Sequence, residues 1–420
     1  MRLIAALSFP LSGLILSLPL ATVSLGSFLG TNVRIWEVLL ITCILVSLAY
    51  KHSSNLARGG LKSAAYLLAA FYIAIILSAG NTIGNLNIFT KQVALMAFMA
   101  SLYIFISLVN LAAYASRISF LVAYSGVLYS IIAIYDLFNN PLDLQTYYFS
   151  TYILPRARGY FAEANEFSQY LGIPFSFILA ILLINNRLRG NQLLILRAGL
   201  LIILLAQLLT FSRGGLVAFA ASILAIPIFA RIPRSLIHSW ARKSILLLFI
   251  VLAAIGLTSM TLFDFDLLNL LHGRFASLLS GEDDTALIRL EAQLATISYL
   301  SGSILQTAFG IGFGNLPLIL DYNAATTANI FIDIFAEIGL FGLTTFCLFL
   351  AFLLYGRRRA LDELRCLGPQ GIIYLGSRIA LFGLLIGGLT YSTYMLNIFW
   401  LCAGLVSASS LNRQCRARSQ

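Results

Sequence analysis

Charged residues are scarce in this chain of 420 residues. Asp, Glu, Lys and Arg together make up 10% of it, and hydrophobic residues make up 60%. A soluble domain carries roughly 25% charged residues, because water must wet its surface. The composition therefore excludes a soluble globular domain.

Cysteine and histidine are also rare, with five and three residues respectively. Cys43, Cys347 and Cys402 fall inside apolar stretches, so they cannot form a disulfide framework in an outer loop. The histidines are scattered along the chain, and no zinc-site spacing is present. We therefore expect neither a disulfide scaffold nor a metal site.

The chain has long apolar runs instead. Crossing a hydrocarbon core of about 30 Å takes roughly 20 helical residues, and inside lipid only helices and closed barrels satisfy the backbone. Runs this continuous predict an all-α, polytopic integral membrane protein whose residues 1–420 form a single transmembrane domain. About twelve spans are predicted, near residues 3–25, 33–50, 63–79, 91–111, 118–138, 167–186, 193–211, 214–230, 244–263, 329–352, 371–389 and 391–410.

The basic residues predict the orientation of these spans. One set of loops, together with the C-terminal tail, holds most of them, including Arg234, Arg242 and the run 357–359. Basic residues accumulate on the cytoplasmic side, so both termini are predicted to be cytoplasmic. We attribute the net charge of +11 to this topology and to attraction by anionic headgroups, and not to nucleic-acid binding. The outer side carries only Arg34, Lys91, Arg156, Arg158, Arg213, Arg274 and Arg289.

Two extracytoplasmic segments are long enough to carry function. They are residues 139–166 and residues 264–328, and the second lies between the ninth and tenth spans. The second contains TALIRLEAQLATISYL at 285–300, whose apolar positions recur at helical spacing. This pattern predicts an amphipathic helix that lies on the membrane surface or caps the bundle.

Arg213 stands between two apolar spans in the sequence LLTFSRGGLVAF. One interpretation is a boundary arginine that extends its charge into the headgroup region. The other is a phosphate or carboxylate site, in which the glycines let the backbone approach an anion and the next helix adds its N-terminal dipole. The residues alone leave both interpretations open.

The other outer arginines gather in the two long segments. Each of them fits a solvated loop with weak local ion pairs. Together they fit a site for a diphosphate group, because the planar guanidinium fork matches phosphate oxygens. These arginines are Arg156, Arg158, Arg274 and Arg289.

Two short motifs stand before predicted spans, TFSRGG at 210–215 and RGYFAEANEFSQYL at 158–171. They resemble the Ser-Arg-Gly signature and the G-x-F-x-x-x-N stretch of one family, the O-antigen ligase and O-antigen polymerase superfamily of membrane glycosyltransferases. FGIGFGN at 309–315 is similar to the Phe-Gly-x-Gly-x-Gly turn that follows an arginine-bearing helix in the family. The next span resembles the family's late helix through Asn329, Glu337, Gly339 and Gly342. The resemblance covers about residues 150–350.

The resemblance implies a GT-C-like fold and a metal-independent, inverting transfer without a cofactor, on the outer face of a bacterial inner membrane. The donor would be a glycan on undecaprenyl diphosphate. The acceptor would be a second lipid-linked repeat unit in a polymerase, or a lipid A core in a ligase. Further partners would be the bilayer, a chain-length regulator and a flippase.

The resemblance also implies roles for single residues. Arginines can stabilise the negative charge of a departing diphosphate without a metal. Arg213 and Arg289 would do so as catalytic residues, with Glu163 as a further catalytic candidate. The substrate-binding residues would be Arg156, Arg158, Asn165, Arg274, Asn329 and Glu337.

One position departs from the family pattern. Ligases of the family carry a histidine just before the asparagine that opens the late span, but TTANIF has Ala328 there. The departure favours a polymerase, or a related exopolysaccharide-extending enzyme, over a ligase. Glu163 and Glu337 are the carboxylates that could accept the acceptor's proton, although Glu337 also fits a carboxylate that pairs inside the bundle.

Two functions of other classes fit a protein with about twelve spans. One is a transporter or flippase for lipid-linked oligosaccharides, and the other is a non-catalytic assembly scaffold. Transporters place charged or Pro/Gly-broken segments near the membrane midplane in both halves of the chain. Here the first five spans are almost free of such features, so we expect a glycosyltransferase that extends O-antigen or exopolysaccharide.

Overall fold

The computed structural model describes most of the chain and shows it to be mostly helical. The described residues are 2–20, 24–28, 31–49, 60–82, 86–108, 111–139, 147–149, 152–154, 156–161, 163–185, 188, 190–231, 284–320, 326–355, 359–392 and 396–410. Their helices are α1 (Arg2–Ser17), α2 (Ile35–Ala49), α3 (Gly60–Ser78), α4 (Leu86–Leu108), α5 (Leu111–Asn139), α6 (Ala164–Ile184), α7 (Asn191–Leu209), α8 (Arg213–Phe229), α11 (Asp284–Ser301), α12 (Ile304–Phe309), α13 (Ile330–Leu354), α14 (Leu361–Leu367), α15 (Pro369–Gly387) and α16 (Asn397–Ser410).

The described strands are short and lie in connections. β1 (Ser24–Phe28) pairs antiparallel with β2 (Thr31–Arg34), and β3 (Tyr147–Phe149) pairs antiparallel with β4 (Tyr152–Leu154). β5 (Ala230–Arg231) pairs in parallel with β6 (Arg359–Ala360). Three 3-10 turns cover Leu18–Leu20, Ala79–Asn81 and Leu316–Leu318. None of these elements alters the all-α character of the protein.

Seven of the helices are long and apolar enough to cross a membrane, and four shorter apolar helices accompany them. The seven are within α3, α4, α5, α6, α7, α13 and α15, and the four are within α1, α2, α8 and α16. Each lies at one of the predicted spans. The remaining predicted span, near 244–263, falls outside the described residues.

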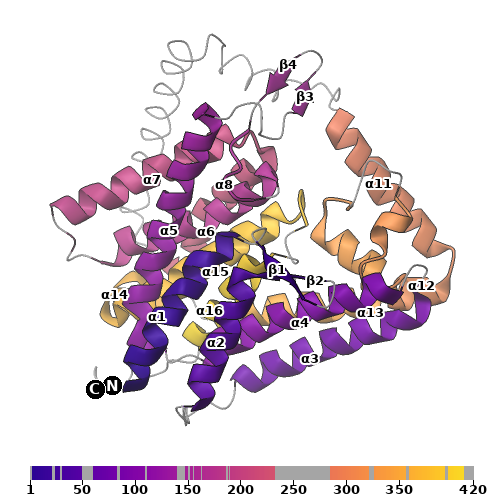
Figure 1. Cartoon of the computed structure of the whole chain (residues 1–420), viewed down its shortest axis with the longest axis horizontal. Helices are drawn as coiled ribbons and strands as arrows, with labels where there is room; N and C mark the ends of the chain where they lie inside the picture. The colour runs from indigo at the N-terminus through magenta and orange to yellow at the C-terminus, as the bar shows by residue number, and fades with distance from the viewer. Residues whose placement is uncertain are drawn as a thin grey trace.

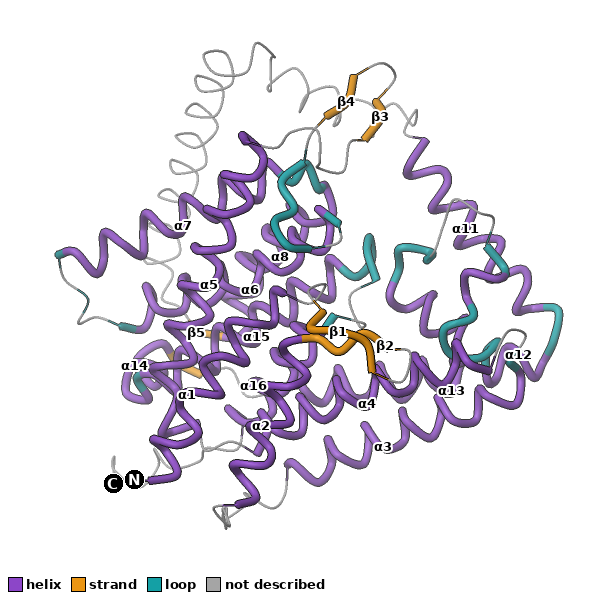
Figure 2. Tube along the Cα trace, viewed as in Figure 1, coloured by secondary structure: helices purple, strands orange, loops and turns teal. Residues whose placement is uncertain are grey.

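The helices pack in two groups. α6 and α15 are the most deeply buried spans. α15 packs against α6, α8 and α16, while α5 packs against α6 and α7. α13 packs along α3, and α16 packs along α4. In Figure 1, α5 to α8 occupy the upper left, and α3, α4 and α13 run together across the lower right. Figure 2 shows the same arrangement with the loops set apart from the helices.

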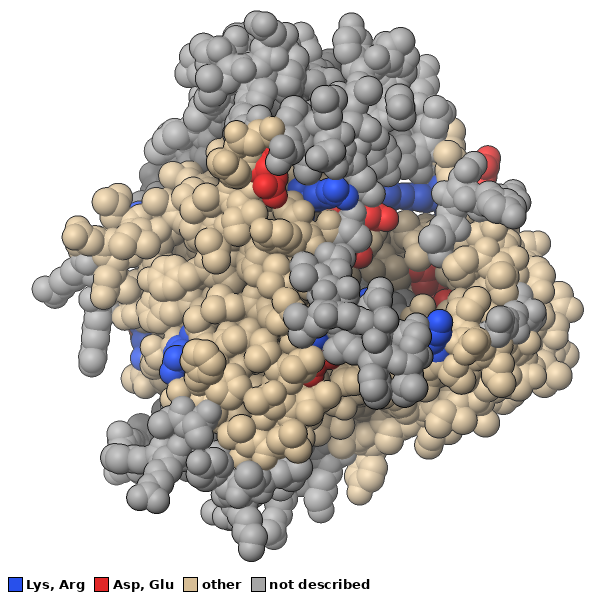
Figure 3. All heavy atoms as spheres, viewed as in Figure 1, with Lys and Arg blue, Asp and Glu red and all other residues tan. Residues whose placement is uncertain are grey.

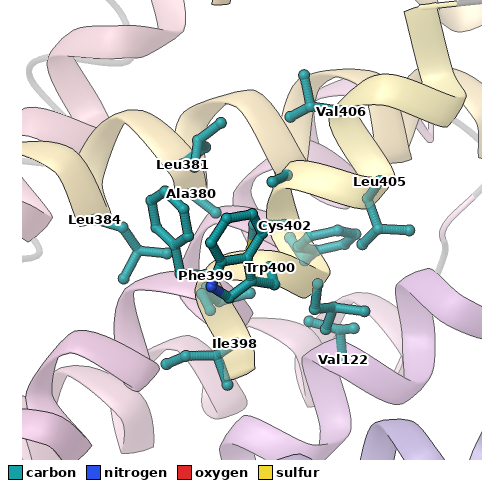
Figure 4. Packing of buried hydrophobic residues seen from close by; sticks show 14 of the residues in the cluster. Val122, Ala380, Leu381, Leu384, Ile398, Phe399, Trp400, Cys402, Leu405 and Val406 are labelled. Carbon is teal, nitrogen blue, oxygen red and sulfur yellow. The ribbon is translucent and has the colours of Figure 1, made fainter. Parts of the chain in front are cut away.

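Aromatic side chains fill the core between α15 and α16. Phe399 and Trp400 are fully buried and lie beside Leu381 and Leu384 of α15 in Figure 4. Trp400 stacks on Phe349 of α13, with 6.0 Å between the ring centroids. This core joins both helix groups, because it draws on α13, α15 and α16 together.

α13 is broken at Gly339, and the glycine turn 309–315 inserts at the break. Gly339 has a φ of +75°, outside the helical region. The break leaves the carbonyl groups of Ala336 and Glu337 without helical donors, and the backbone N–H groups of Ile311 and Gly312 donate to them at 2.9 and 3.2 Å. The glycines of the predicted motif therefore allow two backbones to touch.

The end of α15 corrects the predicted spans. The sequence predicted spans at 371–389 and 391–410, with a single residue between them. In the structure α15 ends at Gly387 and α16 begins at Asn397. Tyr391 and Ser392, which the second predicted span included, therefore lie in a loop.

The helix predicted at 285–300 is present as α11. Its inner face carries Ala292, Thr296 and Leu300, which are buried against α12 and α13. Leu290 and Leu294 lie on its outer face and are at least half exposed. The helix therefore covers α13 on one side and presents apolar side chains on the other.

We expect Gly310→Ala to destabilise the fold more than Gly190→Ala does. Both glycines have a positive φ, +77° and +54°, so alanine costs about 1–2 kcal/mol at either position. A Cβ at Gly310 would also overlap the Glu337 carbonyl, whereas nothing lies within 4 Å at Gly190. This overlap adds about 1–3 kcal/mol. Thermal unfolding of the full chain in one detergent measures both losses, and equal losses would contradict the inserted turn.

Candidate functional site

Polar segments meet at one end of the bundle. They are the N-terminus of α6, the turn 210–212 between α7 and α8, the segment 326–329 before α13, and the loop 388–392 after α15. We call this group the polar junction. Figure 3 shows basic and acidic side chains gathered around a hollow beside the position of α11.

Arg156 links the first outer segment to the turn between α7 and α8. Its guanidinium is 3% exposed, and Nε donates to the carbonyl of Thr210 at 2.6 Å. Nη2 donates to Oδ1 of Asn165 at 2.9 Å, and the N–H of Ala157 donates to the carbonyl of Leu209 at 2.9 Å. Arg156 and Asn165 are thus joined to each other and to the turn by hydrogen bonds. Their predicted binding of substrate stays a prediction.

The turn before Arg213 is capped and closely packed. Ser212 caps α8 by accepting the N–H of Gly215 at 3.3 Å. A Cβ at Gly214 would overlap Oγ1 of Thr390, and a Cβ at Gly215 would overlap Oγ of Ser168. The two glycines therefore let these side chains approach the backbone closely. Arg213 itself is half-buried in the first turn of α8.

Arg289 reaches the same loop from α11. Its Nη1 donates to the carbonyl of Thr390 at 3.1 Å. Gly214 packs against the side chain of this threonine, so Thr390 connects the two helices that carry Arg213 and Arg289. In the part of the chain that the structure describes, no carboxylate forms an ion pair with Arg289.

Tyr391 brings two carboxylates to the junction. Its hydroxyl donates to Oε1 of Glu166 at 3.2 Å, and Glu163 lies beside the same hydroxyl. Burial, followed by the charges of Glu166 and Glu163, raises the pKa of Tyr391 well above its ordinary value. The tyrosine is therefore a neutral donor over the physiological pH range. Glu163 precedes α6 and is half-buried.

The segment before α13 is built from polar caps. Asn329 caps the helix, because its Oδ1 accepts the N–H of Phe331 at 3.0 Å. It was predicted to bind substrate, and this contact gives it a structural role. The N–H of Ile330 donates to the carbonyl of Gly388 at 2.8 Å, which ties the segment to the loop after α15. Ala328 is buried and has a φ of +56°.

Glu337 lies deeper in the bundle than the junction. It is 6% exposed and stands two residues before the break in α13, where its carbonyl binds the glycine turn. This position fits the interpretation of Glu337 as a carboxylate that pairs inside the bundle. Arg158 is half-buried in the segment 156–161 that packs on the end of α7. Arg274 lies outside the described residues.

Sequence patterns did not reveal the loop 388–392 or Asp333. Asp333 is buried, and Thr327 donates to its Oδ1 through both its N–H and its hydroxyl. The available signal was the polar run TYST at 390–393, between apolar stretches. No group of three His, Cys, Asp or Glu side chains able to hold a metal ion occurs among the described residues.

Comparisons with known proteins add no family to this geometry. No protein-family model matches the chain, and no curated protein matches it. The functional argument therefore depends on the residues and their contacts.

We expect Gly214→Ala to lower the melting temperature, and Thr390→Ala to restore part of the loss. The added Cβ overlaps Oγ1 of Thr390, and removing the hydroxyl leaves Cβ of residue 390 at 2.9 Å. Overpacking of this kind costs about 1–3 kcal/mol. A double-mutant cycle on the full chain measures the coupling. Additive effects of the two substitutions would show that the residues do not touch.

Proposed function

We propose that this protein polymerises glycan repeat units carried on undecaprenyl diphosphate, by inverting transfer on the outer face of a bacterial inner membrane. The observation that carries the proposal is Arg289. It is half-buried and held by the neutral carbonyl of Thr390, with no carboxylate ion pair among the described residues. Its positive charge therefore remains available for an anion.

The chemistry needs such a charge. When the bond between the sugar and the diphosphate breaks, negative charge develops on the leaving oxygen, and a preorganised cation stabilises it. Arg213 stands in the first turn of α8, where the helix dipole also favours an anion. Arg289 and the turn that carries Arg213 are both fixed to Thr390, so little reorganisation is needed during the reaction.

The position of Ala328 supports polymerase over ligase activity. The ligases that the sequence resembles carry a histidine there, whereas this residue is a buried alanine with a positive φ. A second lipid-linked repeat unit is therefore the proposed acceptor. The apolar helices supply the surface along which the polyprenyl chains of donor and acceptor lie.

We expect loss of long glycan chains when the gene is deleted in its native host. A surface-glycan gel should then show single repeat units on their anchor, and wild-type protein should restore the ladder. Arg213→Ala and Arg289→Ala should each reduce polymer formation by about 10²-fold or more, the scale for loss of one group that stabilises transition-state charge. Arg231→Ala is the matched control, because Arg231 is exposed just beyond the opposite end of α8.

Other outcomes identify other functions. Long lipid-linked polymer that accumulates without attachment would indicate a ligase. Lipid-linked single units retained on the cytoplasmic leaflet would indicate a flippase. An unchanged ladder in the deletion strain would contradict a role in assembly of that glycan.

A further inference from the structure

The consecutive helices α11 and α12 present apolar side chains on the outside of the protein. On α11, Leu287, Leu290 and Leu294 recur at helical spacing on the face that points away from α13, and all three are exposed. On α12, Ile304 and Leu305 are 89% and 61% exposed. A contiguous apolar surface of this kind marks a site of interaction. The position of the two helices relative to the membrane shows what covers it.

The break in α13 sets the depth at which α12 lies. After Gly339 the helix continues from Leu340 to Leu354, fifteen residues, and Tyr355 beyond it is 91% exposed. Fifteen helical residues rise about 22 Å, whereas the hydrocarbon core is about 30 Å thick. The basic run 357–359 prevents the core from extending past that end of the helix. About 8 Å of hydrocarbon therefore lies on the other side of the break.

α12 occupies this depth. A Cβ on Gly339 would overlap the peptide group between Ala308 and Phe309, so the C-terminal end of α12 touches the break directly. The start of α12 is bonded to the end of another span, because Nδ2 of Asn81 donates to the carbonyl of Leu305 at 3.0 Å. Asn81 ends the apolar span that contains α3. α12 therefore runs from the boundary of the hydrocarbon into it.

The apolar surface of the spans continues onto α12. Ile76 and Leu77 in the last turn of α3 are exposed, and α12 packs beside this end of α3 and along α13. Ile304 and Leu305 extend that surface, and Figure 3 shows neither basic nor acidic side chains at the position of α12. Outward-facing side chains of a span contact lipid tails, so the surface that continues from them faces lipid as well.

We propose that α12 enters the outer leaflet as a re-entrant segment, and that the apolar faces of α11 and α12 contact lipid acyl chains. α11 lies at headgroup level, because Glu291 is exposed beside its leucines and a carboxylate is costly inside hydrocarbon. Non-helical backbone at membrane depth must be satisfied by protein, and the break in α13 does this for the glycine turn after α12. The inference goes beyond the proposed function and does not depend on it.

The depth of α11 also sets the depth of Arg289. This arginine points toward the bundle, where its Nη1 donates to the carbonyl of Thr390 at 3.1 Å. A helix at headgroup level holds such a side chain at the depth of lipid phosphates. A lipid-linked diphosphate would therefore reach Arg289 without leaving its leaflet.

The test is fluorescence quenching of single labelled cysteines in the full chain, reconstituted in vesicles of phosphatidylcholine and phosphatidylglycerol. Alanine first replaces the native cysteines, which are Cys43, Cys347, Cys366, Cys402 and Cys415. A bimane label is then placed at Leu294→Cys or Leu305→Cys. The quencher is either bromine on the lipid acyl chains or iodide in the water.

We expect brominated lipids to quench both labels as strongly as a label at Ile73→Cys, which is 53% exposed on α3. Iodide should quench both far less than a label at Asp362→Cys, whose native side chain is 91% exposed on α14. Each labelled variant must keep the melting temperature of the cysteine-free parent. Ile304→Cys replaces Leu305→Cys if that variant does not.

Two results would overturn the inference. A label that iodide quenches and brominated lipids do not would show that this face lies in water. A label that neither quencher reaches would show that protein covers it, and cross-linking between labelled chains would identify a second copy. The measurement needs no donor or acceptor glycan, so a failure of the proposed function leaves its result unchanged.

Discussion

The loop after α15 holds the polar end of the bundle together. The carbonyl of Gly388 accepts the N–H of Ile330. Two residues later the carbonyl of Thr390 accepts a hydrogen bond from the guanidinium of Arg289. The hydroxyl of Tyr391 then donates to the carboxylate of Glu166. These contacts reach α13, α11 and α6, so one short segment sets the positions of three helices. Inside a bundle of low dielectric such contacts are hard to exchange for water, because an unpaired polar group is costly there.

A second constraint places α11 where its arginine can reach that loop. The glycine turn 309–315 enters the break in α13, where its N–H groups satisfy the carbonyls of Ala336 and Glu337. α12 leads directly into this turn, and α11 precedes α12. A side chain at Gly310 would overlap the backbone of Glu337 at the break. The geometry of the junction therefore depends on a glycine contact far from it in sequence.

Apolar length and periodicity were sufficient to predict the helices, because both are local properties of the chain. The seven described helices that could cross a membrane and the helix at 285–300 follow from them. Local properties cannot separate a buried, hydrogen-bonded arginine from an exposed one, so the contacts of Arg156 with Thr210 and Asn165 could not be predicted. They also failed at the loop 388–392, where the predicted spans 371–389 and 391–410 left only residue 390 between them. Its contacts join residues more than 50 positions apart, which no spacing rule reveals.

Arg289 and Asp333 are each held by neutral groups in the part of the chain that the structure describes. Arg289 binds the neutral carbonyl of Thr390, and Asp333 binds the neutral donors of Thr327. No ion pair joins the two in the described part of the chain, although both attach to segments that meet at the same loop. A salt bridge would neutralise both groups and leave neither for chemistry. Neutral hydrogen bonds instead orient each side chain without pairing it to an opposite charge.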